Sequence, residues 1–180
     1  MEHKFGVFDS TEELNRAAAA QKAEGDLEAL IALALENGLE KEDAEDYMNG
    51  DIDKLATSFI AAFGKLKVET KYLQIEGVLC DWKDIIVSLC EENEDMQAAV
   101  MRKTKSLKEC MAQLIRFSFE NKVQVSEEIV KATKVTHNGR EEPLRGPLYL
   151  GIPNRAEVKK IAMKYYLGNE VVPMAEGSRT

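Results

Sequence analysis

The 180-residue sequence predicts a mainly α-helical, compact domain with one or two short β-strands near residues 134–151. Helices are predicted because capping side chains precede, and glycines follow, segments whose apolar residues recur at three- and four-residue steps. Strands are predicted because residues 135–153 concentrate proline and glycine, and Asn138-Gly139 is typical of a hairpin turn. We expect residues 1–168 to form a single domain and residues 169–180 to be a flexible tail.

The first helices are indicated by the residues at their ends. Ser10 and Glu13 have the spacing of a capping box, and Gly25 is expected to end the helix that they begin. Asp26 is expected to cap the next helix, which Gly38 closes. In order, we expect helices at residues 11–24, 27–37 and 39–49, from Asp51 to Leu66, at 67–92 with Gly77 as a candidate break, and at 94–102.

The C-terminal segments follow the same pattern. Ser106 and Glu109 form a second capping box, which predicts a helix over residues 107–119. Ser126 is expected to cap a short helix at 127–133. Residues 148–150 are expected to form a strand, and Asn154 with Glu157 is expected to cap a last helix that ends at Gly168.

Composition excludes several classes of protein. Apolar residues make up 44% and charged residues 31%, which is typical of a globular chain. No apolar run approaches the roughly 18–20 residues that span a bilayer, and the first ten residues lack the pattern of a secretory signal. Three cysteines, an odd and sparse set, favour buried free thiols in a reducing cytoplasm over a disulfide framework.

Charge is distributed unevenly along the chain, whose net charge is −8. Residues 1–100 contain 23 acidic and 9 basic residues, whereas residues 101–180 contain 9 acidic and 15 basic residues. The expected domain therefore has an acidic half (1–100) and a basic half (101–168). An acidic surface attracts basic proteins and repels nucleic acid, whereas a basic surface can contact phosphate.

The acidic stretch from Glu36 to Leu55 does not match a known metal site. An EF-hand calcium loop that begins at Asn49 would place Lys54 at its glycine position, and the alternative register places Tyr47 at a ligand position. The cysteines and histidines lack zinc-ligand spacing. Phosphate-binding glycine loops are missing, and the two histidines lie in poor contexts for a nucleophile–base pair. We therefore expect no metal, no cofactor and no enzymatic activity.

Two interpretations of the acidic stretch remain open. It could be an ordinary solvated helix surface, or it could be an interaction surface that imitates a phosphate backbone. Tyr47 and Met48 fit an interface, but they also fit inward anchors of the short helix. The candidate partner-binding residues are Glu40, Glu42, Asp43, Glu45, Asp46, Asp51 and Asp53.

The basic residues of the second half allow similar alternatives. They could be ordinary surface residues, or they could contact the phosphates of a nucleic acid. One cluster lies between two predicted helices, and we expect the other to lie roughly on one face of the last helix. The candidate nucleic-acid contacts are Arg102, Lys103, Lys105, Lys108, Lys159, Lys160 and Lys164.

Three segments carry a resemblance to a known family. They are KFGVFDSTEELNRAAAAQKAEGDLEALIALALENGLEKEDAEDYMNGDIDKLAT, GVLCDWKDIIVSLC and LGIPNRAEVKKIAMKYYLG. Together they resemble type II anti-CRISPR proteins, which are Cas9 inhibitors encoded by mobile elements of gut Firmicutes. The stretch KSLKECMAQLI also resembles the PcfK-like proteins of conjugative plasmids.

The resemblance implies a non-enzymatic inhibitor in the cytoplasm of a bacterial host. Such a protein would bind the Cas9–guide RNA complex and block target DNA recognition or cleavage. The alternative is an accessory factor of a conjugative plasmid or integrative element that binds DNA or protein. A homodimer is also conceivable, because helix 27–37 or helix 107–119 could supply an apolar face, although burial within the monomer is equally consistent.

Overall fold

The computed structural model describes residues 6–168, and the tail expected at 169–180 lies outside them. Within this part of the chain, the fold is mainly helical, as predicted. The helices are α1 Thr11–Glu24, α2 Leu27–Glu36, α3 Lys41–Asn49, α4 Ser58–Tyr72, α5 Val78–Glu92, α6 Glu94–Met101, α7 Leu107–Glu120, α8 Glu127–Ala132 and α9 Arg155–Leu167. The strands are β1 Val123–Gln124, β2 Lys134–His137, β3 Arg140–Pro143 and β4 Tyr149–Leu150.

The helix ends confirm most of the capping predictions. The Ser10 hydroxyl accepts a hydrogen bond from the amide of Glu13, and Gly25 ends α1 in the left-handed conformation with φ +70°. Asp26 caps α2 in the same way. Asn154 and Glu157 form a complete capping box at the start of α9, in which each side chain accepts from the other residue's amide.

The expected start of the fourth helix at Asp51 is wrong. Residues 51–55 form bends, and α4 begins only after Thr57, whose hydroxyl accepts from the amide of Ile60. The side chain of Asn15 on α1 explains the delay, because it binds both the N–H and the C=O of Ala56 at 3.0 and 2.9 Å. These two bonds fix the backbone before α4 in a non-helical path.

The expected division near residue 66 is also wrong, because α4 is continuous to Tyr72. The chain instead breaks at residues 73–77, where Gln74 and Gly77 have positive φ angles. The predicted break near Gly77 is confirmed.

Strands β2 and β3 form the predicted hairpin around Asn138-Gly139. The register pairs His137 with Arg140, and both turn residues have positive φ angles of 50° and 77°. This combination is what a two-residue type I′ turn requires. Strand β4 was also predicted, but it pairs with β1, which lies outside the region expected to hold the β-structure.

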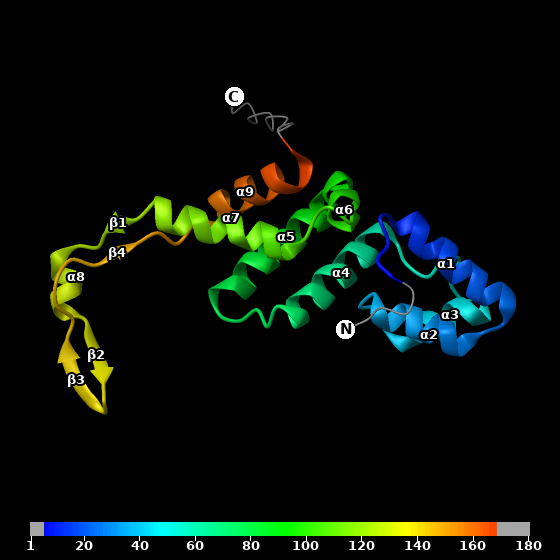
Figure 1. The fold of residues 1–180 in the computed structure, drawn as a ribbon, viewed down its shortest axis with the longest axis horizontal. Coiled ribbons are helices and arrows are strands. Elements are labelled where there is room, and N and C mark those ends of the chain that lie inside the picture. Colours follow the sequence, from blue (N-terminus) through cyan, green and yellow to red (C-terminus); the bar gives the residue numbers. More distant parts are fainter. Residues whose placement is uncertain (1–5, 169–180) are drawn as a thin grey trace, which may run out of the picture.

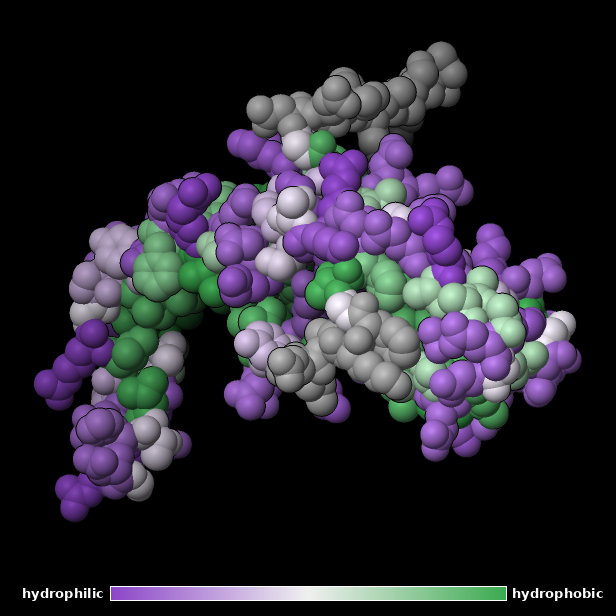
Figure 2. Space-filling model, turned by 45° about the vertical axis from the view of Figure 1, so that its right-hand side comes forward, coloured by the Kyte–Doolittle hydropathy of each residue, from purple (hydrophilic) through white to green (hydrophobic). Residues whose placement is uncertain are grey.

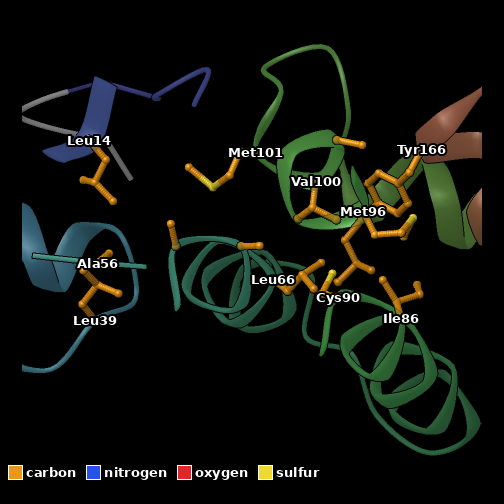
Figure 3. Close-up of a cluster of buried hydrophobic side chains, with 14 of the residues drawn as sticks. Leu14, Leu39, Ala56, Leu66, Ile86, Cys90, Met96, Val100, Met101 and Tyr166 are labelled. Atoms are coloured by element: carbon orange, nitrogen blue, oxygen red, sulfur yellow. The ribbon is translucent and has the colours of Figure 1, made fainter. Parts of the chain in front are cut away.

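The helices form an elongated body in which α4 is central. Helix α4 packs against α1, α5, α6 and α7, and α9 packs against α5, α6 and α7. Figure 1 shows α1, α2 and α3 together at one end of the molecule. In the core, Leu66, Cys90, Val100 and Tyr166 lie together from four different helices (Figure 3).

Two glycines allow a close backbone crossing between the end of α2 and the middle of α4. A Cβ atom on Gly64 would lie 2.2 Å from the carbonyl oxygen of Asn37, and one on Gly38 would lie 2.3 Å from the carbonyl oxygen of Gly64. Real Cβ atoms do not approach so closely, so both positions require glycine.

The segment between α7 and α9, residues 121–152, projects away from the helical body (Figure 1), and we call it the arm. It contains β1, α8, the β2–β3 hairpin and β4. Of its residues only Val130 is buried. Gly151 lies against α7 at its base, where an added Cβ would meet the carbonyl oxygen of Ser118 at 1.9 Å.

Across residues 6–168, no helix combines the length and apolar character needed to cross a membrane.

Candidate functional site

The acidic residues lie on α3 and on the bends that follow it, at the α1–α3 end of the molecule (Figure 1). Helix α3 is amphipathic: it buries Ala44 and Tyr47, whereas Glu42 and Asp46 are exposed. Tyr47 is only 7% exposed, and the Lys22 ammonium lies 4.4 Å from the centre of its ring. Tyr47 and the half-buried Met48 are therefore inward anchors of α3, which was one of the two interpretations left open.

Three of the seven candidate carboxylates already have partners within the chain. Glu40 forms an ion pair with Lys67 on α4, and Glu45 pairs with Lys41 at 2.8 Å, one helical turn away. Asp43 accepts a hydrogen bond from the amide of Glu40 at 2.9 Å and so caps the start of α3. Because these side chains have structural roles, they are weaker candidates for binding a partner.

The other four candidates are exposed, and we call them the open acidic set: Glu42, Asp46, Asp51 and Asp53. Within residues 6–168, none of their carboxylates has a hydrogen bond or an ion pair. Glu42 and Asp46 are four residues apart on one helix, which places their Cβ atoms about 6 Å apart on the same face. Asp51 and Asp53 continue the negative surface beyond the helix end at Gly50.

The described residues hold no group of three or more His, Cys, Asp or Glu side chains arranged to bind a metal ion. The acidic stretch is thus dense in sequence but spread out in space. Its arrangement suits contacts with several separate cationic groups rather than coordination of one ion.

The first basic cluster lies in the loop between α6 and α7 and in the first turn of α7, and part of it is structural. The Lys105 ammonium donates to the carbonyl oxygen of Tyr165 at 2.5 Å and lies 4.6 Å from the centre of that ring. The Tyr165 hydroxyl in turn accepts from the amide of Ser106 at 2.9 Å. Lys105 therefore attaches the loop to α9.

The other members of this cluster are more accessible. The Lys103 amide donates to Asp9 at 2.7 Å, and its ammonium lies 3.8 Å from Glu13. Lys108 is exposed, with its neighbour Glu109 at 3.8 Å, and Arg102 is exposed at the end of α6. Such surface pairs contribute little energy, so these side chains remain available to solvent and ligands.

Two residues that the sequence analysis missed hold this loop in place, and both come from α4. The Lys65 ammonium donates to the carbonyl oxygens of Val100, Arg102 and Lys105 at 2.7, 2.8 and 2.9 Å. It thereby neutralises the carbonyl end of α6, and burial lowers its pKa.

Glu69, one turn further along α4, holds the other end of this loop. Its carboxylate accepts from the amide of Leu107 at 2.9 Å, at the start of α7, and burial raises its pKa. No sequence signal separates Lys65 and Glu69 from the many other lysines and glutamates of the chain.

The second basic cluster divides between two sides of α9. Lys159 pairs with Glu92 of α5 at 3.1 Å. Lys164 instead lines a shallow groove between α7 and α9, together with Arg116, which was not predicted. Lys160 is exposed. The expectation that Lys159, Lys160 and Lys164 share one face therefore needs correction, because Lys159 is turned toward α5.

No family model, no curated protein and no solved structure matches the chain. The function therefore has to be inferred from the surfaces themselves and from the resemblance of the sequence segments described above.

Proposed function

We propose that this protein is a non-enzymatic inhibitor of guide-loaded Cas9, and that it acts in the cytoplasm of a bacterial host. The observation that carries the proposal is the open acidic set, four exposed carboxylates at one end of the molecule that have no hydrogen bond or ion pair within residues 6–168. Cas9 has basic surfaces that such a patch could bind. Its channel for the RNA–DNA heteroduplex is positively charged, and arginines bind the short DNA motif next to the target sequence. The resemblance to anti-CRISPR proteins supports the same conclusion.

The chemistry of recognition follows from the side chains. A carboxylate accepts two parallel hydrogen bonds from an arginine, and such charge-assisted bonds are about twice as strong as neutral ones. Carboxylates distributed over a helix and the following bends can occupy several arginines that would otherwise bind DNA phosphates. Inhibition of this kind requires occupancy of a surface and no chemical step.

The test replaces the open acidic set by its neutral isosteres, Glu42→Gln, Asp46→Asn, Asp51→Asn and Asp53→Asn. A matched control removes four exposed carboxylates elsewhere, at Glu76, Asp81, Asp84 and Glu91. Both variants are titrated into guide-loaded Cas9, with target cleavage and a gel shift of target DNA measured in parallel. We expect the first variant to lose inhibition and the control to keep it.

The outcomes discriminate between mechanisms. If the unaltered protein abolishes both cleavage and the shift, it competes for the DNA-binding surface, whereas loss of cleavage alone places the block after recognition. Equal inhibition by the two variants would exclude the open acidic set. No inhibition of several Cas9 orthologues by the unaltered protein would refute the proposal.

A second candidate function is that of an accessory factor of a conjugative plasmid or integrative element that binds DNA. It is favoured by the charge of residues 102–168, which contain 14 basic and 7 acidic residues, and by Arg116 and Lys164 in the α7–α9 groove. Changing Lys159, Lys160 and Lys164 to Glu should abolish a shift of duplex DNA. DNA affinity without Cas9 affinity would favour this role, and a persistent shift would place the contact elsewhere.

A further inference from the structure

Large apolar side chains are exposed along the arm. The exposed fractions are 69% for Val123, 59% for Ile129, 50% for Tyr149, 47% for Leu150 and 61% for Ile152, and Phe119 at the adjoining end of α7 is 68% exposed. Figure 2 shows hydrophobic surface running down the arm from the helical body. Single exposed apolar residues are common, but five on the narrow arm and a sixth at the adjoining end of α7 form a patch.

The arm gains little stability from its own packing. Fixing a backbone in one conformation costs conformational entropy, which buried contacts have to offset, and among residues 121–152 only Val130 is buried. Strands β1 and β4 pair over just two residues each, and every residue of the β2–β3 hairpin strands is exposed. Two-stranded hairpins are marginally stable in water unless another surface covers them. The arm therefore requires a surface against which it can bury its apolar side chains.

The charges of the arm indicate what that surface is. The arm carries five basic and four acidic side chains, and several are close to each other, as in Lys131 with Glu128 at 3.3 Å and Lys134 with Glu141 at 3.9 Å. A surface of apolar side chains and balanced charges lacks the positive charge that binds nucleic-acid phosphates and the negative charge that binds a strongly basic protein. A surface of mixed charge is self-complementary when a two-fold axis brings it against its own copy.

The area is also appropriate for a dimer. Six large side chains, each about half to two-thirds exposed, present apolar surface on the order of 600 Å², near the ~800 Å² that each partner buries in a stable interface. Among the residues that the structure describes, β1 and β4 pair only with each other, so each leaves an edge to which a strand of another chain can add. We propose that the arm is a dimerisation element, which packs against the arm of a second copy of this chain.

This interface differs from the two helical faces that the sequence analysis considered. It is independent of the proposed function, because the open acidic set lies at the opposite end of the molecule (Figure 1). A dimer joined through its arms would carry two acidic ends directed away from each other.

The test measures the mass of the full chain by light scattering during gel filtration, over a wide range of loading concentrations. We expect a species of twice 20.2 kDa that dissociates on dilution. The variant Val123→Glu with Leu150→Lys removes apolar surface from residues that face each other in the β1–β4 ladder. Its opposite charges preserve the cross-strand pairing, and we expect it to remain monomeric. The matched control, Leu27→Glu with Leu35→Lys on exposed positions of α2, should still dimerise.

Hydrogen exchange of the unaltered protein provides a second readout that needs no variant. Amides of the arm should become more protected as the protein concentration rises, while those of α2 should not change. A monomer at every concentration, or dimers that only the α2 variant disrupts, would overturn the proposal. So would protection of the arm that appears only when duplex DNA or guide-loaded Cas9 is added, because a different partner would then cover it.

Discussion

Lys65 offers the sharpest test of how the molecule is held together. It is the only described side chain whose ammonium donates to three carbonyl oxygens, and these belong to Val100, Arg102 and Lys105. The change Lys65→Met keeps most of the aliphatic volume and removes the charge. The expected result is a large loss of stability without a change of fold.

The magnitude follows from the surroundings of the three carbonyls. Those of Val100 and Lys105 are in part-buried positions, and leaving each unsatisfied costs about 1–3 kcal/mol. The bond to Arg102 is exposed, so water replaces the ammonium there. Burial of the Lys65 ammonium is itself unfavourable, as its lowered pKa indicates. Removing the charge removes this cost and offsets part of the loss. The net destabilisation should be about 2–4 kcal/mol, a fall in Tm of roughly 4–16 °C for a chain of this size.

The assay is thermal unfolding followed by circular dichroism, with Lys67→Met as the matched control. Lys67 lies two residues further along α4, and its side chain is 48% exposed and pairs with the exposed Glu40. An exposed pair of this kind contributes about 0–1 kcal/mol, so the control should change Tm little. Equal Tm shifts in the two variants would refute the idea that Lys65 holds the α6–α7 loop.

Three further predictions concern the core. The substitution Gly64→Ala should destabilise the fold by about 1–3 kcal/mol in denaturant unfolding, because the new Cβ overlaps the carbonyl oxygen of Asn37. Helix propensity alone predicts a gain in stability, and a measured gain would contradict the close contact between α2 and α4. Tyr166→Phe should stabilise the protein by about 1 kcal/mol, because the Tyr166 hydroxyl is buried without a partner among the described residues; a loss would reveal a hydrogen bond to that hydroxyl. Burial raises the pKa of the Cys90 and Cys110 thiols to about 12. The thiols of the unfolded chain ionise near pH 9, whereas the buried thiols of the folded chain stay protonated until the pH approaches 12. The free energy of unfolding is therefore unaffected below pH 9 and falls between pH 9 and 12, by about 1.4 kcal/mol per pH unit for each thiol. Denaturant midpoints between pH 8 and 10 should therefore fall, and they should fall less steeply for Cys110→Ala.

Local signals in the sequence were sufficient for much of the fold. Caps such as Ser10 and Asn154 act within one helical turn, and the Asn138-Gly139 turn requires only its own two residues to adopt positive φ. The start of α4 depends instead on Asn15, 41 residues away, and β1 depends on pairing with β4 across the whole arm. Neither long-range contact leaves a pattern in the neighbouring residues, so neither could be predicted.

The candidate site shows the same limit. The sequence identified the acidic stretch but could not distinguish Asp43, which caps α3, from Asp46, which faces solvent. It likewise grouped Lys105 with Lys108, although Lys105 is bound to α9. Composition indicates where charged residues are abundant, whereas the packing of the helices determines which of them are already bound to other parts of the chain.

The uneven distribution of charge along the molecule gives it a permanent electric dipole. At the α1–α3 end, residues 6–57 contain 14 acidic and 4 basic residues, whereas residues 102–120 and 153–168, which form α7, α9 and their adjoining loops, contain 9 basic and 3 acidic residues. Near a positively charged target, the field exerts a torque that turns the α1–α3 end forward before any contact is made. At physiological ionic strength this alignment acts within about 8 Å, so the molecule is oriented during the last step of its approach.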